Sequence, residues 1–160
     1  MSKPIENEFH TVRGYQLKQQ NEGRLTPALE DYLEMVYRLC RVENYTRVNK
    51  LSESLHVRPS SASKMISKLV ELGYLKYDKH DSILLTEDGR KSGAYLLERH
   101  HIMERFFTLI GSADPLVETE LVEHMICSSS VLRIQAMLEF FEQNPEIEEQ
   151  LKRYYSQLNK

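Results

Sequence analysis

The 160-residue sequence predicts a mainly α-helical protein, in which an N-terminal winged helix-turn-helix precedes a second, helical domain. Apolar residues recur at helical spacing through most of the chain. A short aromatic-rich stretch with a polar turn follows three of these helical segments, which predicts a β-hairpin. Three helices followed by a hairpin wing form a winged helix-turn-helix. We expect an arm at 1–24, the winged-helix domain at 25–90 and the helical domain at 91–160.

Composition and termini are those of a soluble globular chain, with 41% hydrophobic and 28% charged residues. No apolar run approaches the ~18 residues of a membrane span, and the N-terminal stretch MSKPIENEFH lacks the apolar core of a signal peptide. We therefore expect a cytoplasmic protein that does not engage a membrane. Cys40 and Cys127 form neither a dense disulfide framework nor a CxxC pair.

Charge is unevenly distributed along the chain, although the net charge is only −3. Residues 38–79 contain nine Lys or Arg and four acids, a net charge of +5. Residues 112–149 contain nine acids and one Arg, a net charge of −8. A basic half beside an acidic half indicates a polyanion-binding module joined to a different module, although ordinary solvated surface explains the pattern equally well.

The N-terminal segments begin with polar residues 1–24, whose lack of periodicity predicts a flexible arm. A helix is then expected from Pro27 to about Arg41. Thr26 is a suitable N-cap for this helix, and Glu30 is expected to complete a capping box.

Two shorter helices are predicted next, one at about 47–55 and one that begins at Pro59. Arg58 marks the boundary between them, because the residue before a proline avoids the helical region. Residues 74–77 and 83–85 then predict the two strands of the hairpin.

The third helix and the hairpin present hydroxyl and basic side chains on one polar face. In this architecture the third helix enters the major groove of double-stranded DNA, and the wing touches the adjacent backbone. Hydroxyls can reach base edges or phosphates, and basic side chains can contact phosphates or guanine. Any single position could instead belong to an ordinary solvated helix face. The predicted contacts to operator DNA are Arg58, Ser60, Ser61, Ser63, Lys64, Lys68, Lys76 and Lys79.

The second domain is expected to start with a long helix that follows the cap Thr86 and ends near Ile110. Helices at about 115–126, 129–143 and 146–158 follow. The apolar side chains within 129–143 suit a homodimer interface, although a monomer could use them as core.

His and carboxylate side chains recur at spacings that place them on one helix face. Three such groups lie on three different predicted helices: Asp31 with Glu34, His100 with Glu104, and Glu120 with Glu123 and His124. Together they could build one closed metal site. Each group alone is more often a solvated helix face.

The donor atoms of these groups are carboxylate oxygens and imidazole nitrogens, a combination that suits Mn²⁺ or Fe²⁺. A structural zinc site would more often show several cysteines. Cys127 lies three residues after His124, but a small buried hydrophobic residue is the simpler interpretation. Cys40 is expected in the core.

These stretches resemble the manganese transport regulator branch of the diphtheria-toxin-repressor family. The resemblance covers roughly residues 25–143. Its motifs are LEDYLE at 29–34, VRPSSASKM at 57–65, Arg99-His100 with Glu104-Arg105-Phe106, and ELVEH at 120–124.

The resemblance implies a homodimeric repressor that senses Mn²⁺, binds operator DNA and controls metal-uptake genes, with no organic cofactor. Fe²⁺ or another divalent cation is the alternative ligand. Iron-sensing relatives carry Met and Cys at the positions of Asp31 and Glu120. The implied ligands are Asp31, Glu34, His100, Glu120, Glu123 and His124, with Glu104 as an ancillary ligand.

Other interpretations stay open. A winged-helix regulator that is not gated by metal would use the same DNA-binding half and leave the Glu and His side chains as surface. A pure dimeric interaction module would show no affinity for DNA. A helical metalloenzyme is disfavoured, because the sequence has no HExxH motif and because Glu120 and His124 are four residues apart rather than three. We therefore expect a regulator and not an enzyme.

Overall fold

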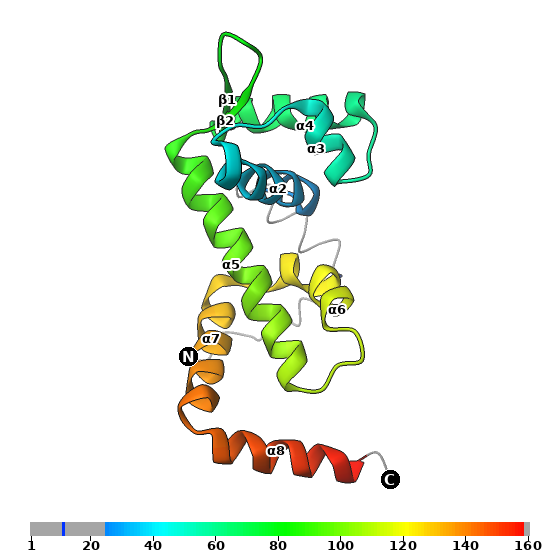
Figure 1. The fold of residues 1–160 in the computed structure, drawn as a ribbon, viewed down its shortest axis with the longest axis vertical. Helices are drawn as coiled ribbons and strands as arrows, with labels where there is room; N and C mark the ends of the chain where they lie inside the picture. The colour runs from blue at the N-terminus through cyan, green and yellow to red at the C-terminus, as the bar shows by residue number, and fades with distance from the viewer. Residues whose placement is uncertain (1–10, 12–24, 159–160) are drawn as a thin grey trace, which may run out of the picture.

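The structure, a computed structural model, describes residue 11 and residues 25–158. The arm predicted at 1–24 lies, apart from residue 11, outside the described residues. No helix in the described part of the chain is long and apolar enough to cross a membrane. The molecule is elongated, and one long helix, α5, runs from the hairpin end towards the opposite end (Figure 1).

The winged helix-turn-helix predicted for the N-terminal half is confirmed and forms one end of the molecule (Figure 1). Its elements are α2 (Pro27–Glu43), α3 (Val48–Ser54), α4 (Pro59–Glu71), β1 (Leu75–Tyr77) and β2 (Ile83–Leu85). The two strands are antiparallel, and Lys76 pairs with Leu84 at their centre. The backbone of Thr46 bonds to Ile83 in both directions, at 3.0 and 2.8 Å, and so adds a short third segment beside the hairpin.

The predicted N-cap of α2 is confirmed, but the predicted capping box is not. The Thr26 hydroxyl accepts a hydrogen bond from the backbone N–H of Leu29 at 3.3 Å. A capping box needs an acidic residue at the third helical position, which Leu29 occupies here. Glu30 comes one residue too late, and its carboxylate contacts Arg99 instead. The capping-box prediction was therefore wrong, and the reason matters for the site described below.

The second half consists of helices, as predicted. Its elements are α5 (Glu87–Leu109), α6 (Pro115–Val122), the 3₁₀ turn η1 (Glu123–Met125), α7 (Ser128–Gln143) and α8 (Pro145–Leu158). The prediction of one continuous helix over 115–126 was wrong, because the chain tightens into η1 after Val122. Such 3₁₀ turns are frequent at helix ends, and this one directs Glu123 inwards, where its side chain is fully buried.

Two hydrophobic clusters hold the described chain together. The larger joins α2, α3, α4 and the hairpin to α5, and includes Cys40, as predicted. The smaller centres on Ile102, Val131 and Leu138. Glycine lets α5 approach its neighbours closely, since a Cβ at Gly93 would lie 2.6 Å from Cβ of Tyr37 on α2.

Candidate metal centre and DNA-binding face

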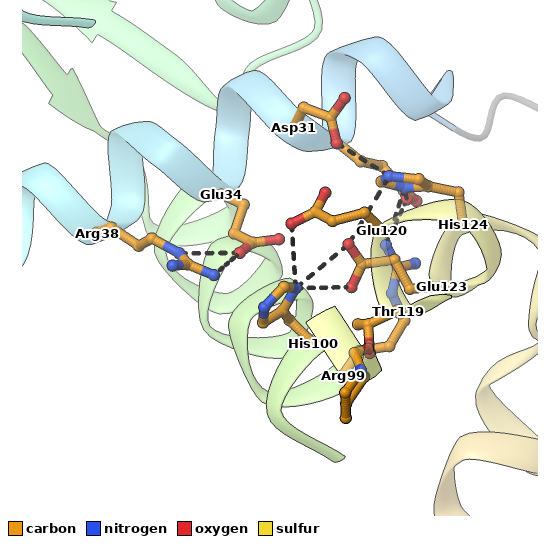
Figure 2. Close-up of polar contacts among 11 residues, drawn as sticks. Asp31, Glu34, Arg38, Arg99, His100, Thr119, Glu120, Glu123 and His124 are labelled. Atoms are coloured by element: carbon orange, nitrogen blue, oxygen red, sulfur yellow. Dashed lines mark hydrogen bonds and ion pairs between the residues drawn. The ribbon is translucent and has the colours of Figure 1, made fainter. Parts of the chain in front are cut away.

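The six residues predicted as metal ligands come together where α2 passes α5 and η1 (Figure 2). Four elements supply them. Asp31 and Glu34 lie on α2, His100 on α5, Glu120 on α6, and Glu123 and His124 on η1.

An inner group of Glu34, His100 and Glu123 is buried. One donor atom from each of these residues lies within 4.8 Å of the other two. Nδ1 of His100 is 3.3 Å from Oε2 of Glu123. Glu120 stands at the rim, with its side chain exposed and its Oε1 3.8 Å from the same Nδ1. This grouping has the size and the burial of a metal-binding site.

An outer group continues from the inner one through His124. Nε2 of His124 lies 2.9 Å from Oδ1 of Asp31 and 3.9 Å from Oε1 of Glu123. Its Nδ1 lies 2.7 Å from Oε2 of Glu30. Asp31 and His124 are therefore bonded to each other and adjoin the inner group at Glu123.

Three residues at this junction were missed by the sequence analysis: Glu30, Arg38 and Arg99. Arg99 is buried and places Nη2 2.7 Å from Oε2 of Glu30, which ties α5 to α2 across 69 residues of sequence. Arg38 binds Glu34 from the next turn of α2. The only available signal was that Glu30, Asp31 and Glu34 crowd one short stretch, because acids so close together need nearby cations.

Hydrogen bonds within the cluster change the ionisation of both histidines. The hydrogen bond to Glu123 raises the pKa of His100. Burial alone lowers the pKa of His124, but its hydrogen bonds to Asp31 and Glu30 prevail and raise that pKa to about 10. Burial, and then the charge of Glu123, raise the pKa of Glu120. The His124 imidazolium and the guanidinium groups of Arg38 and Arg99 thus balance the acids here.

The donor set fits a divalent cation. Oε2 of Glu123 is buried and accepts no hydrogen bond within the described part of the chain, although Nδ1 of His100 lies 3.3 Å from it. A buried carboxylate oxygen without a hydrogen bond is costly, and a bound cation would satisfy it. Oxygen and imidazole donors suit Mn²⁺ and Fe²⁺ in particular. Asp31, Glu34, His100, Glu120, Glu123 and His124 are the residues that could hold such an ion.

Cys127 is exposed, so the interpretation of this residue as a small buried hydrophobic side chain was wrong. It is the N-cap of α7, where the chain turns at the surface. Hydrogen bonds from the Ser129 and Ser130 hydroxyls, both 3.2 Å from its Sγ, lower the pKa of this thiol to about 7.

The predicted DNA contacts lie on α4 and on the hairpin, at the same end of the molecule (Figure 1). Every one of them except the half-buried Ser63 is exposed. Arg58 occupies the N-cap of α4, and Lys68 forms an ion pair with Glu71 at 3.1 Å. The face thus presents basic and hydroxyl groups outward, next to an exposed wing.

Two models of the iron-dependent repressor family match this chain in succession. The model described as the N-terminal DNA-binding domain matches residues 24–83. The model described as the metal-binding and dimerisation domain matches residues 86–152. Together they cover both halves of the structure.

Relatives named HTH-type transcriptional regulator MntR match most of the chain. The one from Listeria welshimeri is 40% identical over 129 residues, which are 79% of this chain and 91% of that protein. The one from Lysinibacillus sphaericus is 37% identical over 136 residues, which are 84% of this chain and 98% of that protein.

Solved structures with the same fold include two regulators of greater length. The manganese regulator SloR superposes with a TM-score of 0.63 at 26% identity, over 72% of this chain and 55% of its own. ScaR with bound Zn²⁺ superposes with a TM-score of 0.59 at 28% identity, over 70% of this chain and 54% of its own.

Proposed function

The chain belongs to the iron-dependent repressor family of transcription regulators, and we propose that it is a homodimeric repressor whose binding to operator DNA is controlled by Mn²⁺. The observation that supports this most is the origin of the six site residues. Asp31 and Glu34 belong to the first helix of the DNA-binding unit, whereas the other four belong to α5, α6 and η1. One site therefore draws on both halves of the molecule.

The choice of Mn²⁺ rests on the donors and on the relatives. Four carboxylates and two imidazoles, without a thiolate among them, are hard-to-borderline ligands. Relatives at about 40% identity carry the name MntR, and SloR is called a manganese regulator. When bound, a divalent cation would supply positive charge among these acids. His100 and His124 would have to release a proton to donate a lone pair.

The residues of the chain connect this site to DNA binding through α2. Asp31 and Glu34 lie on the helix that packs on α4 in the large core, so any restraint on α2 also restrains α4. A two-fold dimer reads a palindromic site only when its recognition helices have the spacing of the DNA helical repeat. Fixing α2 against α5 and η1 would narrow the ensemble to that spacing.

The homodimer is supported by apolar side chains that the single chain leaves exposed. They lie on the two helices that follow α5: Leu116, Val117 and Leu121 on α6, and Leu132 and Phe140 on α7. Both helices fall within the stretch matched by the dimerisation-domain model. A second copy of the chain is the occupant that this family membership supports.

Fluorescence anisotropy tests the proposal with metal-stripped protein and a labelled promoter fragment of a manganese-uptake gene, at fixed salt because phosphate contacts make affinity salt-dependent. We expect tight binding only with Mn²⁺. Glu123→Gln should abolish the Mn²⁺ response, because it removes a buried charge from the site. Glu98→Gln, an exposed change on α5, is the matched control and should respond normally.

Each other outcome leads to a different conclusion. Equal binding with and without Mn²⁺ would leave a winged-helix regulator and remove the metal control. A Glu123→Gln variant that folds and still responds to Mn²⁺ would place the metal elsewhere. Absence of binding in both conditions, across several promoters, would contradict the repressor itself.

A further inference from the structure

Arg38 is a charged residue that the proposed metal site does not use, yet it contacts that site directly. It lies one helical turn after Glu34 on α2. Its Nε and Nη2 both donate to Oε1 of Glu34, at 2.9 and 2.5 Å. A permanently charged side chain thus already neutralises one of the three buried residues of the inner group.

The burial of the pair is asymmetric. The Glu34 side chain is 10% exposed, whereas that of Arg38 is 38% exposed. Both residues line a cavity of about 210 Å³ together with Asp31, Glu120 and Glu123. Arg38 approaches Glu34 from the side opposite His100 (Figure 2). The guanidinium therefore reaches an inner carboxylate from the solvent side and can withdraw into solvent without disturbing the core.

We propose that Arg38 is a displaceable internal counter-ion, which occupies Glu34 in the metal-free protein and thereby raises the concentration of divalent cation needed to fill the site. This inference rests on the proposed function. A guanidinium stays charged at every physiological pH. It competes for Oε1 of Glu34 and also repels an incoming cation, and both effects weaken metal binding.

The opposite role, in which Arg38 orients Glu34 for the metal, fits the contacts less well. An orienting group is usually held in place by partners of its own. Within the part of the chain that the structure describes, Arg38 hydrogen-bonds to Glu34 alone. Arg99 provides the contrast, because it is buried and bridges α5 to Glu30 on α2. The Arg99 ion pair therefore holds two helices together, whereas the Arg38 ion pair can open without separating any elements.

Mn²⁺ affinity of the metal-stripped full chain tests this, with free Mn²⁺ measured by its electron paramagnetic resonance signal and no DNA present. We expect Arg38→Gln to bind Mn²⁺ about tenfold more tightly than the wild type, which is the scale of a partly exposed hydrogen-bonded ion pair. Arg41→Gln removes the same charge one turn further along α2, at an exposed position, and should change affinity less than about twofold. Arg38→Lys should fall between Arg38→Gln and the wild type.

Three results would overturn the inference. Weaker Mn²⁺ binding by Arg38→Gln would make Arg38 a supporting residue of the site. Equal tightening in Arg38→Gln and Arg41→Gln would reduce the effect to net charge. No Mn²⁺ binding by the wild type would remove the proposed function first, and this inference with it.

A second measurement does not depend on the affinity of any variant. In the metal-free protein the Arg38 Nε–H should give a slowly exchanging NMR signal, because it is bonded to Glu34. Addition of diamagnetic Zn²⁺ should move this signal to the position and exchange rate of a solvated arginine. A signal that stays protected in the Zn²⁺-loaded protein would contradict displacement.

Discussion

The two halves of the molecule differ in how much of their apolar surface they bury themselves. The DNA-binding half shares a cluster of thirteen buried residues with the start of α5, from Leu29 on α2 to Leu96 on α5. The cluster centred in the second half contains three, Ile102, Val131 and Leu138. The first half therefore contains most of the larger core, whereas α6 and α7 in the second leave large apolar side chains exposed.

The proposed metal site lies between these unequal halves. It joins α2, which is anchored in the large core, to η1, which follows the exposed apolar helix α6. A metal ion bound in this place would link the proposed dimer interface to the DNA-binding unit.

Leu33→Ala should produce the largest effect, a loss of ~2–5 kcal/mol in the free energy of unfolding, because it leaves a cavity in a packed core. Leu33 is 0% exposed, whereas Leu132 on α7 is 65% exposed. Leu132→Ala is therefore the control and should change the unfolding free energy by less than ~0.5 kcal/mol in the monomer. Urea unfolding of dilute, metal-free protein measures both. Similar losses of unfolding free energy in Leu33→Ala and Leu132→Ala would refute the contrast in packing between the two halves.

Leu121→Glu should weaken the dimer about thirtyfold, ~2 kcal/mol, while leaving the fold of each subunit intact. Leu121 is among the most exposed large apolar side chains of α6. Sedimentation velocity over a concentration series gives the dissociation constant. Val42→Glu, at an equally exposed position on α2, should leave it unchanged. A dimer that tolerates Leu121→Glu would place the interface elsewhere.

Gly93→Ala should cost on the order of 1–2 kcal/mol, because the new Cβ would collide with Tyr37 and push α5 away from α2. Thermal unfolding of the single and double variants measures this cost. Combined with Tyr37→Gly, which removes the Cβ as well as the ring, the substitution should cost less than the sum of the two single changes, because the clash is then gone. Simple additivity would show that the close approach is not the cause.

The stability of the metal-free protein should fall gradually as the pH rises. Folding raises the pKa of His124 from about 6.5 to about 10, so its ion pairs with Asp31 and Glu30 contribute fully below pH 6.5 and are lost towards pH 10. We expect the free energy of unfolding to decline by a few kcal/mol at most across this window, because each pKa unit corresponds to about 1.4 kcal/mol. Urea midpoints at several pH values should show this slope in the wild type and not in His124→Gln. Parallel slopes would exclude His124 as the source.

The sequence predicted those features that depend on short-range spacing. The caps Thr26 and Thr86, the proline that starts α4 and the hairpin turn are local signals, and each is confirmed. The site residues were predictable because carboxylates and imidazoles recur at helical intervals on three segments. The structure brings all six together, and their metal-binding role stays a prediction.

What the sequence could not show depends on tertiary contacts. Glu30 contacts Arg99, which is 69 residues away, and Thr46 pairs with Ile83 on β2. The spacing from Thr26 already placed Glu30 one residue beyond the capping-box position, but nothing local indicated that its partner is Arg99. The change to a 3₁₀ turn at Glu123 was also hidden, because the apolar spacing of 115–126 continues through it.

The central claim is that metal binding and DNA binding are coupled through the junction of the two halves. Thermodynamic linkage makes the coupling reciprocal, so the Mn²⁺ dissociation constant should be measured with and without saturating operator DNA. We predict that DNA tightens Mn²⁺ binding by the same factor by which Mn²⁺ tightens DNA binding, roughly 5–150-fold. An unchanged Mn²⁺ dissociation constant in the presence of bound DNA would contradict the claim.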